Sequence, residues 1–137
     1  MTQTLTGKRI LVTQADEFMG PMLCEVLAEH GADVIRSTVP LIASGAADAV
    51  VRDVGAIDIL IANLAYAAPT SLAVEATDAE WTETFAALVD PLPRLFRAIL
   101  PMMIERRSGK ILVMGSASAL RGMKRASTYS AARGAQL

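Results

Sequence analysis

The sequence predicts an α/β protein built on a doubly wound parallel sheet with helices on both faces. Three observations predict this class. Four short apolar runs alternate with segments of helical periodicity along the chain. The third run, residues 57–63, is apolar almost throughout, as in a parallel strand that is buried on both faces. With 137 residues, of which 53% are hydrophobic, the chain is suited to a single domain with a core of its own.

The first half of the chain is predicted to supply three strands and two helices. Strands are expected at residues 9–13, 33–36 and 57–63, and helices at residues 20–30 and 46–54. Gly31 ends the first helix, because glycine is the common residue just past a helix terminus. Strand and helix therefore alternate, as they do in βαβ units.

In the second half, a long helix is followed by a fourth strand and a final helix. Thr77 and Glu80 form the pattern of a capping box, which predicts a helix start. Three prolines, Pro91, Pro93 and Pro101, fall inside this helical region and predict kinks or a local break. Residues 110–116 are expected to form the fourth strand, and the last helix is expected to begin near Ser127. We expect one domain over residues 1–137.

Composition narrows the classes of partner. The net charge is −1, which argues against nucleic acid or an anionic membrane as the main partner. The start of the chain has no apolar segment typical of a signal peptide, and Cys24 is the one cysteine, so we expect a cytoplasmic protein. One histidine and one cysteine far apart give no support for a metal site or for a Ser-His or Cys-His triad.

The segment after the first strand reads Thr-Gln-Ala-Asp-Glu-Phe-Met-Gly, from Thr13 to Gly20. Its position resembles the Thr-Gly-x-x-x-Gly-x-Gly loop of short-chain dehydrogenases, in which small residues let backbone N–H groups approach a pyrophosphate. Here Gln14 and Phe18 replace the first two glycines. We expect the Phe18 ring to fill the space that a dinucleotide needs; the alternative is that Phe18 packs as core between helix and sheet.

Ser116, Tyr129 and Arg133 form a second pattern. Ser116 lies at the carboxyl end of the fourth strand, where open α/β sheets place their ligands. Tyr129 follows thirteen residues later, and Arg133 lies one helical turn beyond it, so the phenol and the guanidinium share a helix face. A cation beside Tyr129 favours its phenolate form, which suits a general base.

This Ser-Tyr-Arg set, together with an aromatic residue in the former glycine loop, resembles the halohydrin dehalogenases, a cofactor-independent branch of the short-chain dehydrogenase superfamily with a Rossmann-like fold. The resemblance covers residues 7–137 and implies that the later part of the family fold lies beyond Leu137. It implies a lyase that converts vicinal haloalcohols to epoxides, releasing halide and a proton, and that opens epoxides with small anions in reverse. Tyr129 would be the general base, Arg133 would support the phenolate, and Ser116 would hold the substrate oxygen.

The same resemblance implies that no nicotinamide cofactor and no metal is bound, and that Phe18 and Tyr66 line the substrate and halide pocket. Leu88 occupies the position at which dehydrogenases of this superfamily carry an asparagine of a proton relay. Related proteins pair through the long helix and the helix of Tyr129, and the apolar residues of the long helix offer more surface than one side of a sheet can hide: Phe85, Leu92, Leu95, Phe96 and Ile99. We therefore expect a homo-oligomer, a dimer or a homotetramer. We also assign Ser118 a loop or capping role, and expect Asn63 to tie neighbouring strands together.

Two other functions remain open on the sequence. The first is an NAD(P)-dependent short-chain dehydrogenase or reductase with an atypical glycine loop. The second is a non-catalytic, truncated Rossmann module that binds a ligand or partner. Cofactor titration tests the former, and halide release tests the latter.

Overall fold

Four parallel strands form the sheet in the computed structural model, which describes residues 4–137. The strands are β1 (Arg9–Val12), β2 (Asp33–Arg36), β3 (Ile59–Ala62) and β4 (Lys110–Val113). Their order across the sheet is β2-β1-β3-β4, and Leu11 at the centre of β1 pairs with Ile35 of β2 and Leu60 of β3. The predicted parallel sheet is confirmed, although β3 and β4 are shorter than the apolar runs that contain them.

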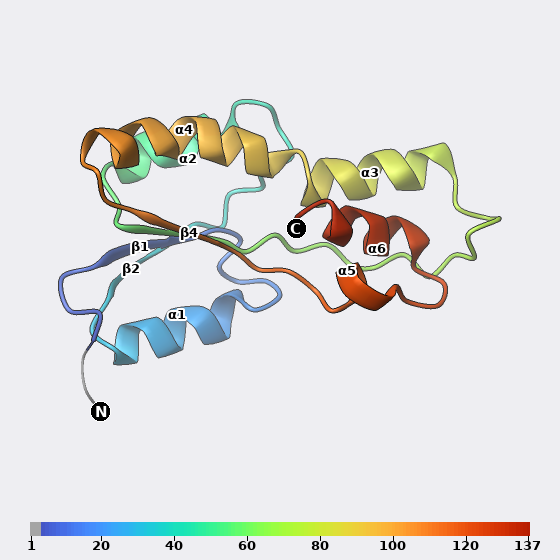
Figure 1. Cartoon of the computed structure of the whole chain (residues 1–137), viewed down its shortest axis with the longest axis horizontal. Helices are drawn as coiled ribbons and strands as arrows, with labels where there is room; N and C mark the ends of the chain where they lie inside the picture. The colour runs from blue at the N-terminus through green and yellow to red at the C-terminus, as the bar shows by residue number, and fades with distance from the viewer. Residues whose placement is uncertain (1–3) are drawn as a thin grey trace.

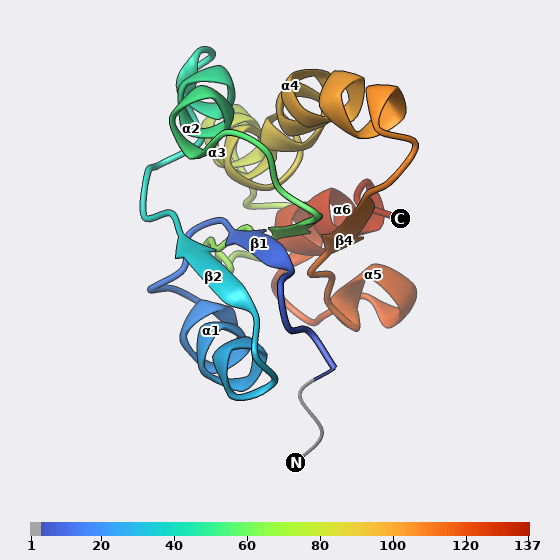
Figure 2. The ribbon, with the colours of Figure 1, turned by 90° about the vertical axis from the view of Figure 1, so that its left-hand side faces the viewer.

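Helices cover both faces of this sheet. The described residues contain α1 (Gly20–Glu29), α2 (Ala46–Val54), α3 (Asp78–Leu88), α4 (Pro91–Glu105), α5 (Ser118–Arg121) and α6 (Ser127–Gly134). In Figure 1, α1 lies below the sheet and α2 and α4 lie above it, and Figure 2 shows the same layers along the strands. The short helix α5 is the one element that the apolar pattern does not predict.

The predicted long helix is two helices with a break before Pro91. α3 ends at Leu88 and α4 begins at Pro91, which takes the first-turn position that proline tolerates best. α4 then continues through Pro101. At the start of α3, the Thr77 hydroxyl accepts a hydrogen bond from the Glu80 N–H at 3.1 Å, which confirms the predicted N-cap.

Two apolar clusters hold the layers together. The smaller cluster joins α1 to β1 and includes Ile10, Val12 and Cys24. The larger one, on the other face, contains Leu92, Leu95 and Ile99 of α4, all almost fully buried within the chain. The expectation that these three residues supply surface for an oligomer is therefore wrong. They complete the core of the single chain, because α4 packs them against α2 and the sheet.

Both edges of the sheet are single strands without a further neighbour among residues 4–137. In the common doubly wound order 3-2-1-4-5-6, a third strand stands beside the second. Here the chain passes from β2 through α2 directly to β3 on the other side of β1, so β2 is an edge. β4 is the other edge, and Leu112 on it is 46% exposed.

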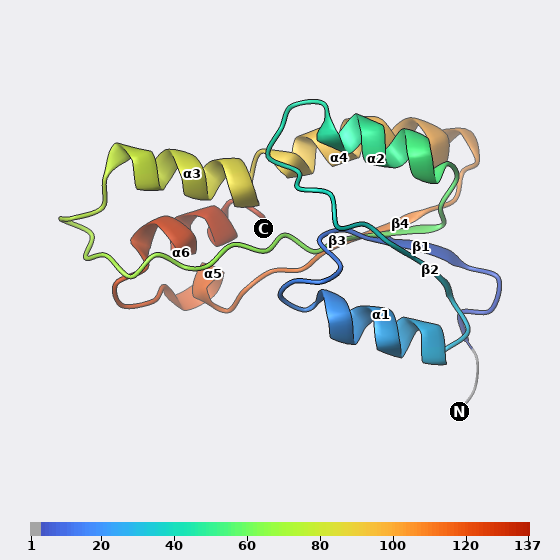
Figure 3. The ribbon, with the colours of Figure 1, turned by 180° about the vertical axis from the view of Figure 1, so that it is seen from behind.

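The helices α3, α5 and α6 extend beyond the carboxyl ends of the strands. Figures 1 and 3 both show α3 beside α6, with α5 close to α6. The segments that follow β1, β3 and β4 therefore converge near α6. No helix among the described residues is long and apolar enough to span a membrane.

Candidate active site

Tyr129 and Arg133 lie on one face of α6 and are hydrogen-bonded to each other. The Arg133 Nε–H group donates to the Tyr129 hydroxyl oxygen at 3.0 Å. Tyr129 is 8% exposed and Arg133 is fully buried. The predicted i, i+4 pairing of phenol and guanidinium is thus present in the structure, and a charge-assisted donor faces the oxygen that would carry negative charge.

The remaining nitrogens of Arg133 are held by uncharged oxygen atoms. Nη1 donates to the main-chain carbonyl of Met114 at 3.0 Å and to the Gln136 side chain at 3.1 Å. Nη2 donates to the carbonyl of Leu64 at 3.0 Å. The ion pairs formed by residues 4–137 do not include Arg133. A buried cation without a carboxylate partner is uncommon, and the ionisable acid that it does contact is the Tyr129 phenol.

Phe18 reaches the same guanidinium from the loop after β1. The Arg133 Cζ atom lies 5.0 Å from the Phe18 ring centroid and 5.0 Å from the Tyr129 ring centroid. Both distances are within the range of cation–π interactions. Phe18 is 50% exposed, so its side chain is not part of the core between α1 and the sheet. The alternative of a core phenylalanine is wrong.

The loop between β1 and α1 keeps a glycine-type backbone without its glycines. Gln14 has φ of 43° and Phe18 has φ of 50°, values that glycine adopts readily and other residues rarely do. The Gln14 side chain exchanges two hydrogen bonds with the main chain of Ala65. The Asn63 amide donates to the carbonyls of Gln14 and Glu17, both at 3.0 Å. We expected Asn63 to join neighbouring strands. Instead, it ties this loop to the end of β3.

Ser116 follows β4, two residues after the carbonyl of Met114 that binds Arg133. Its hydroxyl oxygen accepts from the Ser118 N–H at 3.3 Å and bonds the Ser118 hydroxyl at 2.9 Å. Ser118 begins α5 and is buried, so it holds Ser116 as well as starting a helix. Within residues 4–137, no hydrogen bond joins Ser116 to Tyr129.

Tyr66 is half-buried and lines a hollow of about 230 Å³, together with Gln14, Glu17 and Ala87. Phe18 is not among the lining residues, so the structure does not place the two aromatic residues in one hollow.

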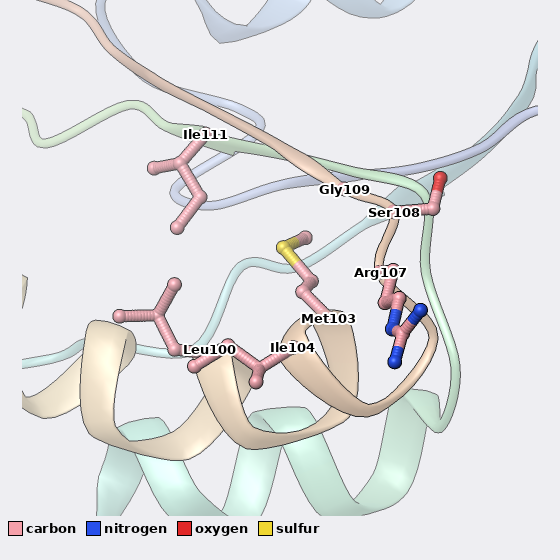
Figure 4. Close-up of a pocket in the computed structure, with 7 residues that line it drawn as sticks. All are labelled: Leu100, Met103, Ile104, Arg107, Ser108, Gly109 and Ile111. Atoms are coloured by element: carbon pink, nitrogen blue, oxygen red, sulfur yellow. The ribbon is translucent and has the colours of Figure 1, made fainter.

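A larger depression of about 490 Å³ lies between the end of α4 and the start of β4 and includes Met103 and Ile111 (Figure 4). It is at the amino end of β4 and so at the opposite end of that strand from Ser116.

One carboxylate of the β1 loop, that of Asp16, is paired with a cation. Asp16 accepts a hydrogen bond from Arg36 at the end of β2, and this bond raises the pKa of the Arg36 guanidinium. Within residues 4–137, no group of three or more metal-ligating side chains is present.

Two contacts of this site were not predicted from the sequence, those of Gln136 and the bond between Ser118 and Ser116. Gln136 accepts from Arg133, and its amide N–H group donates to the main-chain carbonyl of Leu88 at 2.7 Å. The spacing of three residues between Arg133 and Gln136 on a helical segment could have indicated this contact. The bond between Ser118 and Ser116 had no comparable signal, because it depends on the turn that follows β4.

The fold and the site define an α/β protein of the Rossmann type with a serine, a tyrosine and a cation at the carboxyl edge of its sheet. The model of the short chain dehydrogenase family matches residues 42–136. The chain belongs to the short-chain dehydrogenase family.

Similar proteins carry oxidoreductase names. The chain is 30% identical to the 3-oxoacyl-[acyl-carrier-protein] reductase FabG of Vibrio harveyi, over 94% of this chain and 63% of that protein. It is 28% identical to the uncharacterized oxidoreductase YvaG of Bacillus subtilis, over 100% of this chain and 61% of that protein. The chain thus spans about three fifths of the length of these relatives.

Solved structures agree on the fold. The L-sorbose reductase of Gluconobacter frateurii superposes with a TM-score of 0.88 at 24% identity, over 98% of this chain and 62% of that one. A structure described as a dehalogenation enzyme superposes with a TM-score of 0.81 at 22% identity, over 95% and 62%. At these identities the likeness extends to the fold alone. None of these findings is specific to halohydrin dehalogenases, so that narrower resemblance remains a proposal.

Proposed function

We propose that this site removes the proton of a substrate hydroxyl group and that the reaction is the cofactor-independent conversion of a vicinal haloalcohol to an epoxide. The observation that carries the proposal is the environment of Arg133. The guanidinium is fully buried, is bound by uncharged oxygens and has Tyr129 as its ionisable neighbour. Negative charge on the Tyr129 oxygen would therefore be stabilised directly in a site of low dielectric constant.

The residues present do not fit the nicotinamide dinucleotide that the family implies. In the β1 loop, the Phe18 ring lies against Arg133, and the Gln14 side chain is hydrogen-bonded to the main chain of Ala65. Asp16 and Glu17 add carboxylates where a pyrophosphate would need positive charge. Arg133, at the position of the family lysine, has no exposed surface with which to hold a ribose. These contacts support a reaction that transfers no hydride.

In the proposed reaction, the Tyr129 oxygen takes the hydroxyl proton of the haloalcohol. Ser116 donates a hydrogen bond to the same substrate oxygen, because its own oxygen already accepts from the Ser118 N–H group. The alkoxide attacks the neighbouring carbon, the new C–O bond closes the epoxide, and halide leaves with the electron pair of the C–X bond. In the reverse direction a small anion opens the epoxide, and Tyr129 returns the proton.

The direct test is halide release from a simple vicinal haloalcohol. Tyr129→Phe is expected to abolish it, since the proton acceptor is gone, and Ser116→Ala is expected to lower kcat by about 100-fold through loss of a donor to the developing charge. Ser130→Ala is the matched control, because this hydroxyl lies on the same helix but accepts from the Met123 N–H. Halide release that survives in Tyr129→Phe would contradict the assignment.

A second candidate is NAD(P)-dependent reduction or dehydrogenation, and the named relatives favour it over the dehalogenase. FabG and YvaG are named as a reductase and an oxidoreductase. Arg36 also stands at the end of β2, where an arginine can accommodate the 2′-phosphate of NADP, although Asp16 pairs with it here. Titration with NADH and NADPH separates the candidates. Saturable binding in the micromolar range, with turnover of a carbonyl substrate and no halide release, would establish this second function.

A further inference from the structure

Gln136 connects the Arg133 guanidinium to the end of a different helix. Its side-chain oxygen accepts from Arg133 Nη1 at 3.1 Å, and its side-chain nitrogen donates to the Leu88 carbonyl at 2.7 Å. Leu88 is the last residue of α3, so its carbonyl is one of those that a helix terminus leaves without a partner inside the helix. The Gln136 N–H group also donates to the Arg133 carbonyl, which anchors the backbone beside the residue that it contacts.

The orientation of this amide is determined by its two partners. A guanidinium has donors only, so it must face the amide oxygen, and a main-chain carbonyl has acceptors only, so it must face the amide nitrogen. Gln136 therefore satisfies both groups, and neither aspartate, glutamate nor an apolar residue could do the same. The contact couples α6 to α3 through the cation of the site.

The effect reaches Tyr129 because a guanidinium is planar. Gln136 and Met114 hold Nη1, and Leu64 holds Nη2, so these contacts together set the plane and the direction of the Nε–H bond. That bond ends on the Tyr129 oxygen. Among these anchors, Met114 and Leu64 contribute main-chain carbonyls, and Gln136 contributes the side chain that can be altered without changing the backbone.

We propose that Gln136 is a positioning residue, which braces Arg133 against α3 and so keeps its Nε–H group on the oxygen of Tyr129. The proposal rests on the proposed role of Tyr129 as the base. Other charged groups on the elements packed against α6 are Arg121 of α5 and Asp78, Glu80 and Glu83 of α3. Of these, Glu80 accepts a hydrogen bond from Thr128, the residue before Tyr129, and its charge is common to every variant below.

The test uses a readout that does not require activity. Tyr66 and Tyr129 are the two tyrosines of the sequence, so a Tyr66→Phe background reports the ionisation of Tyr129 alone in an ultraviolet pH titration. Gln136→Glu keeps the size of the side chain and adds a second anion beside the guanidinium. We expect this variant to move the Tyr129 midpoint to higher pH, because two anions then compete for one cation.

Gln136→Met removes both hydrogen bonds and adds no charge. It is expected to move the Tyr129 midpoint to higher pH and to lower kcat for halide release by about tenfold with little change in KM, because the donor on Tyr129 is no longer held in place. Ala135→Gln is the matched control, since Ala135 is exposed and adjacent, and it should leave the titration and kcat unchanged. Thermal unfolding of each variant establishes that it is folded, and Gln136→Asn replaces any variant that is not.

The outcomes separate the two proposals. If the parent releases no halide but Gln136→Met, which adds no charge, still shifts the Tyr129 titration, the proposed reaction fails and the positioning role stands. If both Gln136 variants lose stability while the Tyr129 midpoint and kcat stay at the parent values, then Gln136 only caps α3. That second result would overturn the inference.

Discussion

Phe18 and Arg133 form a cation–π pair that joins the loop after β1 to α6, with the guanidinium carbon 5.0 Å from the ring centroid. The Tyr129 ring lies at the same distance from that carbon, so the cation is in contact with two aromatic rings. In this position Phe18 has a backbone φ of 50°, a left-handed conformation that is strained for a residue other than glycine. The two departures from the dehydrogenase pattern, an aromatic residue in the loop and an arginine in the helix, are therefore in contact with each other.

Substitution of Phe18 separates these two effects. Phe18→Gly relieves about 1–2 kcal/mol of left-handed backbone strain. It is destabilised by about 0.5–1 kcal/mol through the entropy of glycine in the unfolded chain, and by about 0.5–1 kcal/mol through loss of the cation–π contact. Its net effect on the free energy of unfolding should be close to zero. Phe18→Leu keeps the strain and loses the contact, so it should be less stable by about 1 kcal/mol. Urea unfolding measures both. Equal stability of the Leu variant and the parent would contradict the cation–π contribution.

Gly20 is the one glycine of the dehydrogenase loop that this chain retains, and its surroundings explain why. A Cβ atom at Gly20 would lie 2.5 Å from the main-chain oxygen of Ala15, which cannot move aside easily. Gly20→Ala should therefore destabilise the fold by about 1–3 kcal/mol or more. Gly45→Ala is the control, because nothing lies within 4 Å of its added Cβ atom. Comparable unfolding midpoints for the two variants would show that the loop can move.

Much of the fold could be predicted because parallel strands and amphipathic helices leave local patterns. The run that contains β3 is apolar, Thr77 has the partner of an N-cap, and Pro91 marks the start of α4. The burial of Leu92, Leu95 and Ile99 could not be assigned correctly, because the pattern shows an apolar helix face but not which layer covers it. α5 is a single turn, too short for any periodicity.

The site was predictable where its residues share one helix. Tyr129 and Arg133 meet because of their spacing along α6. The positive φ values of Gln14 and Phe18 were not predictable. A loop that lacks glycine is expected to lack the left-handed backbone conformation as well. The carbonyls of Leu64, Met114 and Leu88 were also missed, because main-chain acceptors carry no sequence signal.

Oligomer formation is untested, and we expect a dimer or a tetramer through α3, α4 and α6. Trp81 on α3 is 38% exposed, and its ring lies 6.0 Å from that of Phe85, so an aromatic surface remains uncovered in the single chain. Light scattering should report a mass of two or four chains, and Trp81→Glu should lower it, because a charge would be buried in the interface. A monomer in the parent protein would contradict this expectation.

Cys24 provides a pH prediction. Burial raises the pKa of its thiol, and the neutral form is therefore favoured in the folded protein. The folded state holds this proton more tightly than the unfolded state, so its contribution to stability is present at neutral pH and declines as the pH rises above the unfolded value near 9.0. Because Cys24 is the one cysteine, thiol labelling can be followed without ambiguity. Labelling should be slow up to that pH and become fast on addition of urea; fast labelling of the folded protein would contradict the burial.

Arg133→Lys tests whether the cation acts through its charge alone or through its planar shape. Lysine keeps the charge but has one nitrogen, which cannot reach the oxygens of Tyr129, Leu64 and Met114 at once. At least one buried carbonyl would lose its donor, so we expect the free energy of unfolding to fall by about 1–3 kcal/mol. Halide release should fall without vanishing, since a positive charge remains near Tyr129. The variant should also bind no NADPH, because Gln14 and Phe18 still occupy the loop. Saturable NADPH binding by Arg133→Lys would show that the arginine, and not the loop, is what keeps a dinucleotide out.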